Sequence, residues 1–218
     1  MLILIITDIF GLNQYVKSFA KQLVGQTEAN LKIVDPYNGI EQNFNGEGEA
    51  YKTFINNCGH QNYSEKVTQA IQKLSGDTIV IAFSAGASAT WKSMDANNSI
   101  NKTNKIKYQY ISNFIGFYPS QIRNQLDVVP CCPVTLVFPK TEPHFDIEQT
   151  IKSLSLIDNV RCFKTSYQHG FMNPLSKNYT PTAESYFVMK IIEVSENRFD
   201  FSNINSTITE NTAHFFKR

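Results

Sequence analysis

The chain has little that would suit a nucleic-acid or membrane partner. Its 20 Lys and Arg residues nearly balance 19 Asp and Glu residues, for a formal net charge of +1, and the basic residues are scattered. Without a continuous basic stripe, we expect no interface for a phosphate backbone or an anionic bilayer. No apolar run approaches the roughly 18 residues needed to span a membrane. The apolar N-terminus ends at Asp8 and lacks the basic start of a secretory signal, so it predicts a buried strand.

Cysteine is also sparse. The four cysteines are Cys58, Cys131, Cys132 and Cys162, with no CxxC pair and no His/Cys cluster at the spacing of metal ligands. Adjacent Cys131 and Cys132 stand before an expected strand, where a thiol serves as a small hydrophobic group. We therefore expect reduced thiols, a cytoplasmic location, no metal and no cofactor.

Linkers, internal repeats and low-complexity segments are absent as well. A chain of 218 residues with 42% hydrophobic content can bury one substantial core, so we expect a single domain over residues 1–218. The polar stretch from about residue 195 is expected to lie on the surface or fray.

What the chain does contain is a regular succession of short apolar runs. Six runs predict strands, and helical patterns of apolar residues lie between them. The runs are continuous rather than alternating, which favours a mostly parallel sheet of about six strands covered by helices on both faces, an α/β fold. The expected strands are 1–7, 31–34, 77–83, 114–118, 134–138 and 160–165. The expected helices are 13–24, 49–56, 64–74, 85–95, 147–156 and 182–194, and polar loops are expected at 35–48 and 97–107.

The third of these strands ends at a serine that is flanked by small residues. Ser84 has Ala82 two positions before it and Gly86 two positions after it. A nucleophile elbow requires small residues at these positions, because the sharp turn brings strand and helix backbones almost into contact. A serine at a strand-to-helix turn is equally compatible with a simple helix N-cap.

The order of three candidate side chains favours the nucleophile. Ser84, Glu142 and His169 follow the order nucleophile, acid, base, and each lies at the carboxyl end of an expected strand, where the loops of a parallel sheet converge. His169 would accept the proton of Ser84, and the acid would orient the imidazole. Asp146, four residues after Glu142, is the alternative acid.

Main-chain and apolar groups complete the expected site. An oxyanion hole would use the backbone N–H of Ala85 and that of Ile9, in the loop after the first strand. Asp8, Phe10, Tyr118 and Phe171 are expected to line the crevice and to favour an apolar acyl or lactone group. For Tyr118, ordinary packing at a strand end is the alternative.

Four segments resemble the dienelactone hydrolase family of α/β-hydrolases, over about residues 1–194. T-D-I-F-G-L at 7–12 is similar to the family's P-E-I-F-G-L, and V-D-P-Y at 34–37 is similar to its P-D-L-Y. A-F-S-A-G-A at 82–87 resembles its G-F-C-x-G-G elbow. Y-Q-H-G-F at 167–171, followed by Asn178, Tyr179 and Ala183, resembles its Y-x-x-x-H-G-F and N-Y-x-x-x-A. The resemblance implies an α/β-hydrolase fold.

The departures from this pattern are informative. Ser84 stands where the family often has cysteine, and Asp8 stands where it has a glutamate that interacts with that cysteine. Glu142 replaces an aspartate. Asn173 occupies the place of an arginine that holds the carboxylate of dienelactone, which implies a different natural substrate.

We therefore expect a serine-dependent hydrolase of small carboxylic esters or lactones that acts as a monomer or homodimer. The alternative is a catalytically inactive protein of this fold that binds a small ligand or partner. A flavodoxin-like binding protein is a third class, but the loop after the first strand is not rich in glycine or hydroxyl residues, as a phosphate loop requires.

Overall fold

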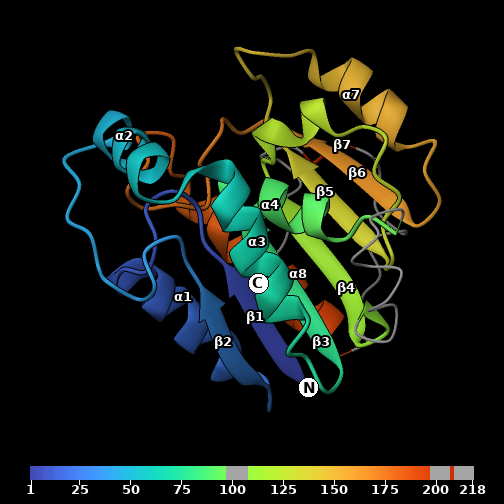
Figure 1. The fold of residues 1–218 in the computed structure, drawn as a ribbon, viewed down its shortest axis with the longest axis horizontal. Helices are drawn as coiled ribbons and strands as arrows, with labels where there is room; N and C mark the ends of the chain where they lie inside the picture. Colours follow the sequence, from blue (N-terminus) through green and yellow to red (C-terminus); the bar gives the residue numbers. More distant parts are fainter. Residues whose placement is uncertain (97–107, 197–206, 209–218) are drawn as a thin grey trace.

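The computed structural model describes residues 1–96, 108–196 and 207–208 as one parallel β-sheet between two layers of helices (Figure 1). All strand pairs are parallel, in the order β2-β1-β3-β4-β5-β6-β7. The strands are β1 (Leu2–Ile6), β2 (Asn30–Val34), β3 (Thr78–Phe83), β4 (Ile111–Phe117), β5 (Val134–Phe138), β6 (Val160–Thr165) and β7 (Thr207–Ile208). The helices are α1 (Gln14–Val24), α2 (Glu47–Asn57), α3 (Gly59–Ile71), α4 (Ala85–Ser93), α7 (Ile147–Leu154) and α8 (Pro181–Ser195), with the 3₁₀ helix η1 (Ser120–Asn124).

The sheet divides the hydrophobic core into two clusters, because successive side chains of a strand point to opposite faces. In β1, Leu4 and Ile6 belong to the cluster that packs against α2, α3, α4 and α7. Ile3 and Ile5 belong to the cluster on the other face, against α1 and α8. All four side chains are fully buried. The predicted parallel sheet with helices on both faces is therefore confirmed.

The C-terminal region differs from the prediction at one point. Thr207–Ile208 forms a two-residue strand, β7, which pairs with β6 at Lys164 and Thr165. The sheet therefore has a seventh strand, within the stretch that we interpreted as a surface tail. The sequence did not predict this strand because two residues are too few to form a recognisable apolar run. Residues 197–206 and 209–218 of that tail, and the polar loop expected at 97–107, lie outside the described residues.

None of the helices that the structure describes is both long and apolar enough to cross a bilayer.

The turn from β3 into α4 is the tightest point of the fold. A Cβ atom on Gly86 would lie 2.2 Å from the carbonyl oxygen of Thr7 and 2.9 Å from that of Ile6. Both contacts are with backbone at the end of β1, which cannot move without disturbing the centre of the sheet. Only glycine fits at this position, and α4 can therefore begin directly against β1.

Replacing Gly86 with alanine should destabilise the protein by about 1–3 kcal/mol, because the added methyl group overpacks a rigid backbone contact. The measurement is urea unfolding followed by circular dichroism. The matched control is Gly48→Ala in α2, where an added Cβ meets nothing within 4 Å. Equal unfolding midpoints for the two variants would contradict this account of the turn.

Candidate active site

Ser84 occupies a strained position at the β3–α4 turn. Its φ of 49° and ψ of −114° lie in a region that non-glycine residues rarely adopt. The conformation is held by hydrogen bonds on both sides: the Ser84 N–H donates to the Phe117 carbonyl at 2.9 Å, and the Ser84 carbonyl accepts from the Ser88 N–H at 3.0 Å. The N-cap alternative does not describe this residue, because its side chain makes no capping hydrogen bond.

Three predicted side chains meet in a continuous chain of hydrogen bonds. Ser84 Oγ lies 2.9 Å from His169 Nε2, and His169 Nδ1 lies 2.6 Å from Glu142 Oε1. The Glu142 side chain is only 5% exposed, compared with 33% for His169. An ionised carboxylate only accepts hydrogen bonds, so we assign the imidazole proton to Nδ1. Nε2 is then left to accept the hydrogen bond of the Ser84 hydroxyl.

The alternative acid has a different environment. Asp146 is exposed and caps α7, where its Oδ1 accepts a hydrogen bond from the Gln149 N–H at 3.1 Å. Of the two acids that the sequence left open, the structure places Glu142 at the imidazole.

The His169 loop is held by several local contacts. Gly170 has a φ of 86°, and a Cβ atom there would lie 2.5 Å from Ser176 Oγ. The Asn178 side chain donates to the His169 carbonyl at 2.9 Å. The Tyr118 ring packs against the imidazole with a centroid distance of 4.8 Å. These contacts orient the histidine toward Ser84.

The two backbone N–H groups that the sequence predicts as an oxyanion hole have no acceptor within the described residues. Ala85 is the first residue of α4, and the first N–H groups of a helix lack intrahelical acceptors. The Ile9 N–H is likewise unpartnered, whereas the next N–H, that of Phe10, donates to Asp8. Ile9 and Ala85 both line the cleft that contains Ser84.

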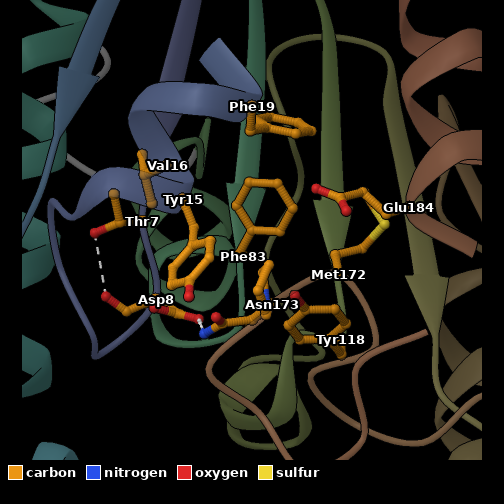
Figure 2. Close-up of a pocket in the computed structure, with 11 residues that line it drawn as sticks. Thr7, Asp8, Tyr15, Val16, Phe19, Phe83, Tyr118, Met172, Asn173 and Glu184 are labelled. Carbon is orange, nitrogen blue, oxygen red and sulfur yellow. Dashed lines mark hydrogen bonds between the residues drawn. The ribbon is translucent and has the colours of Figure 1, made fainter. Parts of the chain in front are cut away.

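Asp8 is a buried carboxylate at the end of β1. Its Oδ1 accepts from the Phe10 N–H at 2.9 Å. Its Oδ2 accepts from the Asn173 side chain at 2.6 Å, as Figure 2 shows. Burial raises the pKa of Asp8 from 3.8 to about 6. The two donors and nearby His169 lower this pKa, but by less than burial raises it, and Glu47 adds a smaller increase.

The cleft has a volume of about 580 Å³ and carries both apolar and charged groups. Asp8, Phe10 and Tyr118 line it as expected. Phe171 does not: it is fully buried and packs against Tyr118 and Phe187, so it supports the site from behind. The Phe171 prediction assumed that nearness to His169 in the sequence meant exposure to the cleft.

A smaller pocket of about 40 Å³ shares part of its lining with the cleft. Its lining residues are drawn in Figure 2. Asp8, Tyr118 and Asn173 line both spaces. The rest of its lining is mainly apolar and includes Phe19, Phe83 and Met172.

Sequence reasoning missed several residues of the site. Arg123, Lys177 and His60 line the cleft from segments without a catalytic motif. The Tyr37 hydroxyl donates to the Ile9 carbonyl at 2.7 Å across 28 residues, and the only signal for it was the V-D-P-Y resemblance. Asn173 was noted only as a missing arginine, yet it binds Asp8. Among the described residues, no three His, Cys, Asp or Glu side chains are grouped as metal ligands.

The chain was compared with known protein families, sequences and structures. No protein-family model matches the chain. It is 26% identical over 185 residues to the uncharacterized protein YczH of Bacillus subtilis (strain 168), across 79% of this chain and 81% of that protein.

Two solved structures give the same TM-score of 0.60. One is a dienelactone hydrolase-like promiscuous phosphotriesterase from metagenomic libraries, 13% identical over 91% of this chain and 87% of that one. The other is an α/β-superfamily protein from Xanthomonas campestris pv. campestris, 8% identical over 90% of this chain and 98% of that one. The chain has the α/β-hydrolase fold.

Neutralising Asp8 should change how stability depends on pH. Since the folded-state pKa of about 6 exceeds the usual 3.8, the folded protein binds more protons than the unfolded chain between these values. Stability is therefore lost as the pH rises through this window. Relative to Asp8→Asn, the free energy of unfolding of the wild type should fall by on the order of 3 kcal/mol between pH 4 and pH 7.

The measurement is urea unfolding at half-unit pH steps. Asp146→Asn is the control for removal of an exposed carboxylate outside the cleft. If the difference in the free energy of unfolding between wild type and Asp8→Asn stays constant from pH 4 to pH 7, the pKa of Asp8 is not raised.

Proposed function

We propose that this α/β-hydrolase-fold chain hydrolyses carboxylic esters or lactones through an acyl-enzyme on Ser84. The observation that carries the proposal is the hydrogen-bond chain from Ser84 Oγ through the His169 ring to Glu142, at 2.9 and 2.6 Å. It lies in a cleft large enough for a small substrate. The hydrogen-bond geometry also argues against the inactive alternative, because each donor already faces the acceptor that the chemistry requires.

In the acylation step, Ser84 Oγ attacks the carbonyl carbon while its proton moves to His169 Nε2. The negative charge that develops on the carbonyl oxygen is bound by the N–H groups of Ala85 and Ile9, which have no acceptor among the described residues. As the tetrahedral intermediate collapses, the ester C–O bond breaks and the imidazolium returns the proton to the leaving alcohol. The acyl group remains on Ser84.

Deacylation repeats these steps with water. His169 accepts a proton from the water as its oxygen attacks the acyl carbon, and the proton then returns to Ser84 Oγ as the acid leaves. Glu142 stays ionised throughout, holds the Nδ1 proton and stabilises the charged imidazolium. Its 5% exposure keeps this interaction away from competing water.

The substrate would contact Asp8, Phe10 and Tyr118, which line the cleft. The name of one structural neighbour, a dienelactone hydrolase-like phosphotriesterase, supports an ester bond as the target. Asn173 is committed to Asp8. An amide carries no charge, so position 173 does not offer the contact to a carboxylate that the dienelactone resemblance would require; the basic side chains that line the cleft are Arg123 and Lys177.

Ser84→Ala should abolish hydrolysis of a p-nitrophenyl ester panel and remove labelling by a fluorophosphonate, because no other group replaces the nucleophile. Labelling is measured by intact-protein mass spectrometry, with one adduct expected per wild-type chain. Ser185→Ala, on the exposed face of α8, is the control and should behave as wild type. Unlabelled wild type, or labelling that survives Ser84→Ala, would refute the proposal and favour an inactive ligand-binding protein.

Glu142→Gln should lower kcat by at least about a hundredfold, because an amide cannot stabilise the imidazolium and can present its N–H₂ group to the ring. Asp146→Asn makes the corresponding change at the other candidate acid and should leave kcat within about twofold of wild type. Steady-state kinetics at pH 8 decides between the two acids. The reverse ranking would assign the acid to Asp146.

A further inference from the structure

We propose that Asp8 is a positioning residue which, together with Asn173, holds the loop after β1 so that the Ile9 N–H faces the developing oxyanion. This inference rests on the proposed function, because it concerns the same reaction. It concerns a carboxylate that the Ser84, His169 and Glu142 chain does not use.

The first step concerns the peptide bond between Asp8 and Ile9. Its carbonyl oxygen accepts hydrogen bonds from the Gly11 N–H at 3.2 Å and from Thr7 Oγ1 at 3.1 Å. In a planar trans peptide the N–H points opposite to the carbonyl. The two donors therefore also fix the direction of the Ile9 N–H. Among the residues that the structure describes, this N–H has no acceptor, and Ile9 lines the cleft.

The second step concerns the next peptide bond, between Ile9 and Phe10. Its carbonyl accepts from the Tyr37 hydroxyl at 2.7 Å, and its N–H donates to Asp8 Oδ1 at 2.9 Å. Both peptide planes around Ile9 are thus restrained. Asp8 takes part in both, through its main-chain carbonyl and through its carboxylate.

The third step is how the carboxylate itself is oriented. Asn173 Nδ2 donates to Asp8 Oδ2 at 2.6 Å (Figure 2). Asn173 Oδ1 in turn accepts from the Leu175 N–H at 2.8 Å. The Asn173 N–H donates to the Gly170 carbonyl at 2.9 Å. The Asp8–Asn173 hydrogen bond therefore ties the loop that carries Ile9 to the loop that carries His169.

Energetics support a functional role for this group. Burying a carboxylate is costly, and the raised pKa of Asp8 shows that its hydrogen bonds do not fully offset the cost. The charged groups near it are His169 and Glu47, which line the same cleft. Asp8 therefore contributes little to the stability of the folded protein at neutral pH. Its hydrogen bonds instead restrain the loop that carries the Ile9 N–H.

The test exchanges the donor and the acceptor. In Asp8→Asn, the new amide N–H₂ faces that of Asn173, and in Asn173→Asp two carboxylates oppose each other. The double variant Asp8→Asn/Asn173→Asp restores one donor and one acceptor between the positions. It also keeps an acceptor for the N–H groups of Phe10 and Leu175.

Each single variant should lower kcat by about tenfold to a hundredfold with KM within about twofold, because the affected contact forms in the transition state. The affinity for an alkyl boronic acid that adds to Ser84 should fall by the same factor. The double variant should recover kcat to within about threefold of wild type. Asp146→Asn is the control for loss of a carboxylate outside the cleft and should keep the wild-type kcat.

Tyr37→Phe provides an independent variant in case the single variants at positions 8 and 173 fail to fold. It removes the partner of the Ile9 carbonyl without touching the buried charge, so it should lower kcat at unchanged KM. Wild-type kcat in Asp8→Asn or in Tyr37→Phe would overturn the inference. So would a double variant that regains the wild-type Tm but not kcat. Wild type that neither hydrolyses esters nor reacts with a fluorophosphonate would overturn the proposed function and this inference together.

Discussion

The close approach of α4 to β1 at Gly86 is the constraint on which the site depends. Because no Cβ atom fits between Gly86 and the carbonyls of Ile6 and Thr7, the chain can turn directly from β3 into α4 beside the end of β1. The turn places Ser84 at positive φ and leaves the Ala85 N–H at the start of a helix, and both residues line the same cleft as Ile9. A bulkier residue at position 86 would separate the two loops that the proposed chemistry requires together.

Much of this arrangement was predictable from the sequence, and the reasons are local. The strands were recognisable as continuous apolar runs, and Ser84, Glu142 and His169 each follow such a run, so a parallel sheet brings them to the same edge. The choice between Glu142 and Asp146 depends on the path of the loop between β5 and α7. The periodicity of apolar residues does not predict the path of a loop. Similarly, Phe171 lies two residues after His169 but points into the core.

The interactions that escaped prediction are long-range and involve residue types with many ordinary uses. Asn173 and Asp8 are 165 residues apart, and Tyr37 reaches Ile9 across 28 residues. Asparagine and tyrosine at loop positions carry no pattern that would single out such partners. Arg123 and Lys177 reach the cleft from η1 and from the loop before α8, and their arrival there depends on how the loops pack rather than on secondary structure.

The shared wall between the two pockets bears on substrate size. Asp8, Tyr118 and Asn173 line both the cleft of about 580 Å³ and the mainly apolar space of about 40 Å³. The Asp8–Asn173 hydrogen bond that ties the two loops together therefore joins two residues that face both spaces. Smaller side chains along this wall would join the two spaces into one longer channel. Under the proposed function, selectivity for acyl length and the position of the Ile9 N–H would depend on the same residues, so variation at this wall would alter both properties at once.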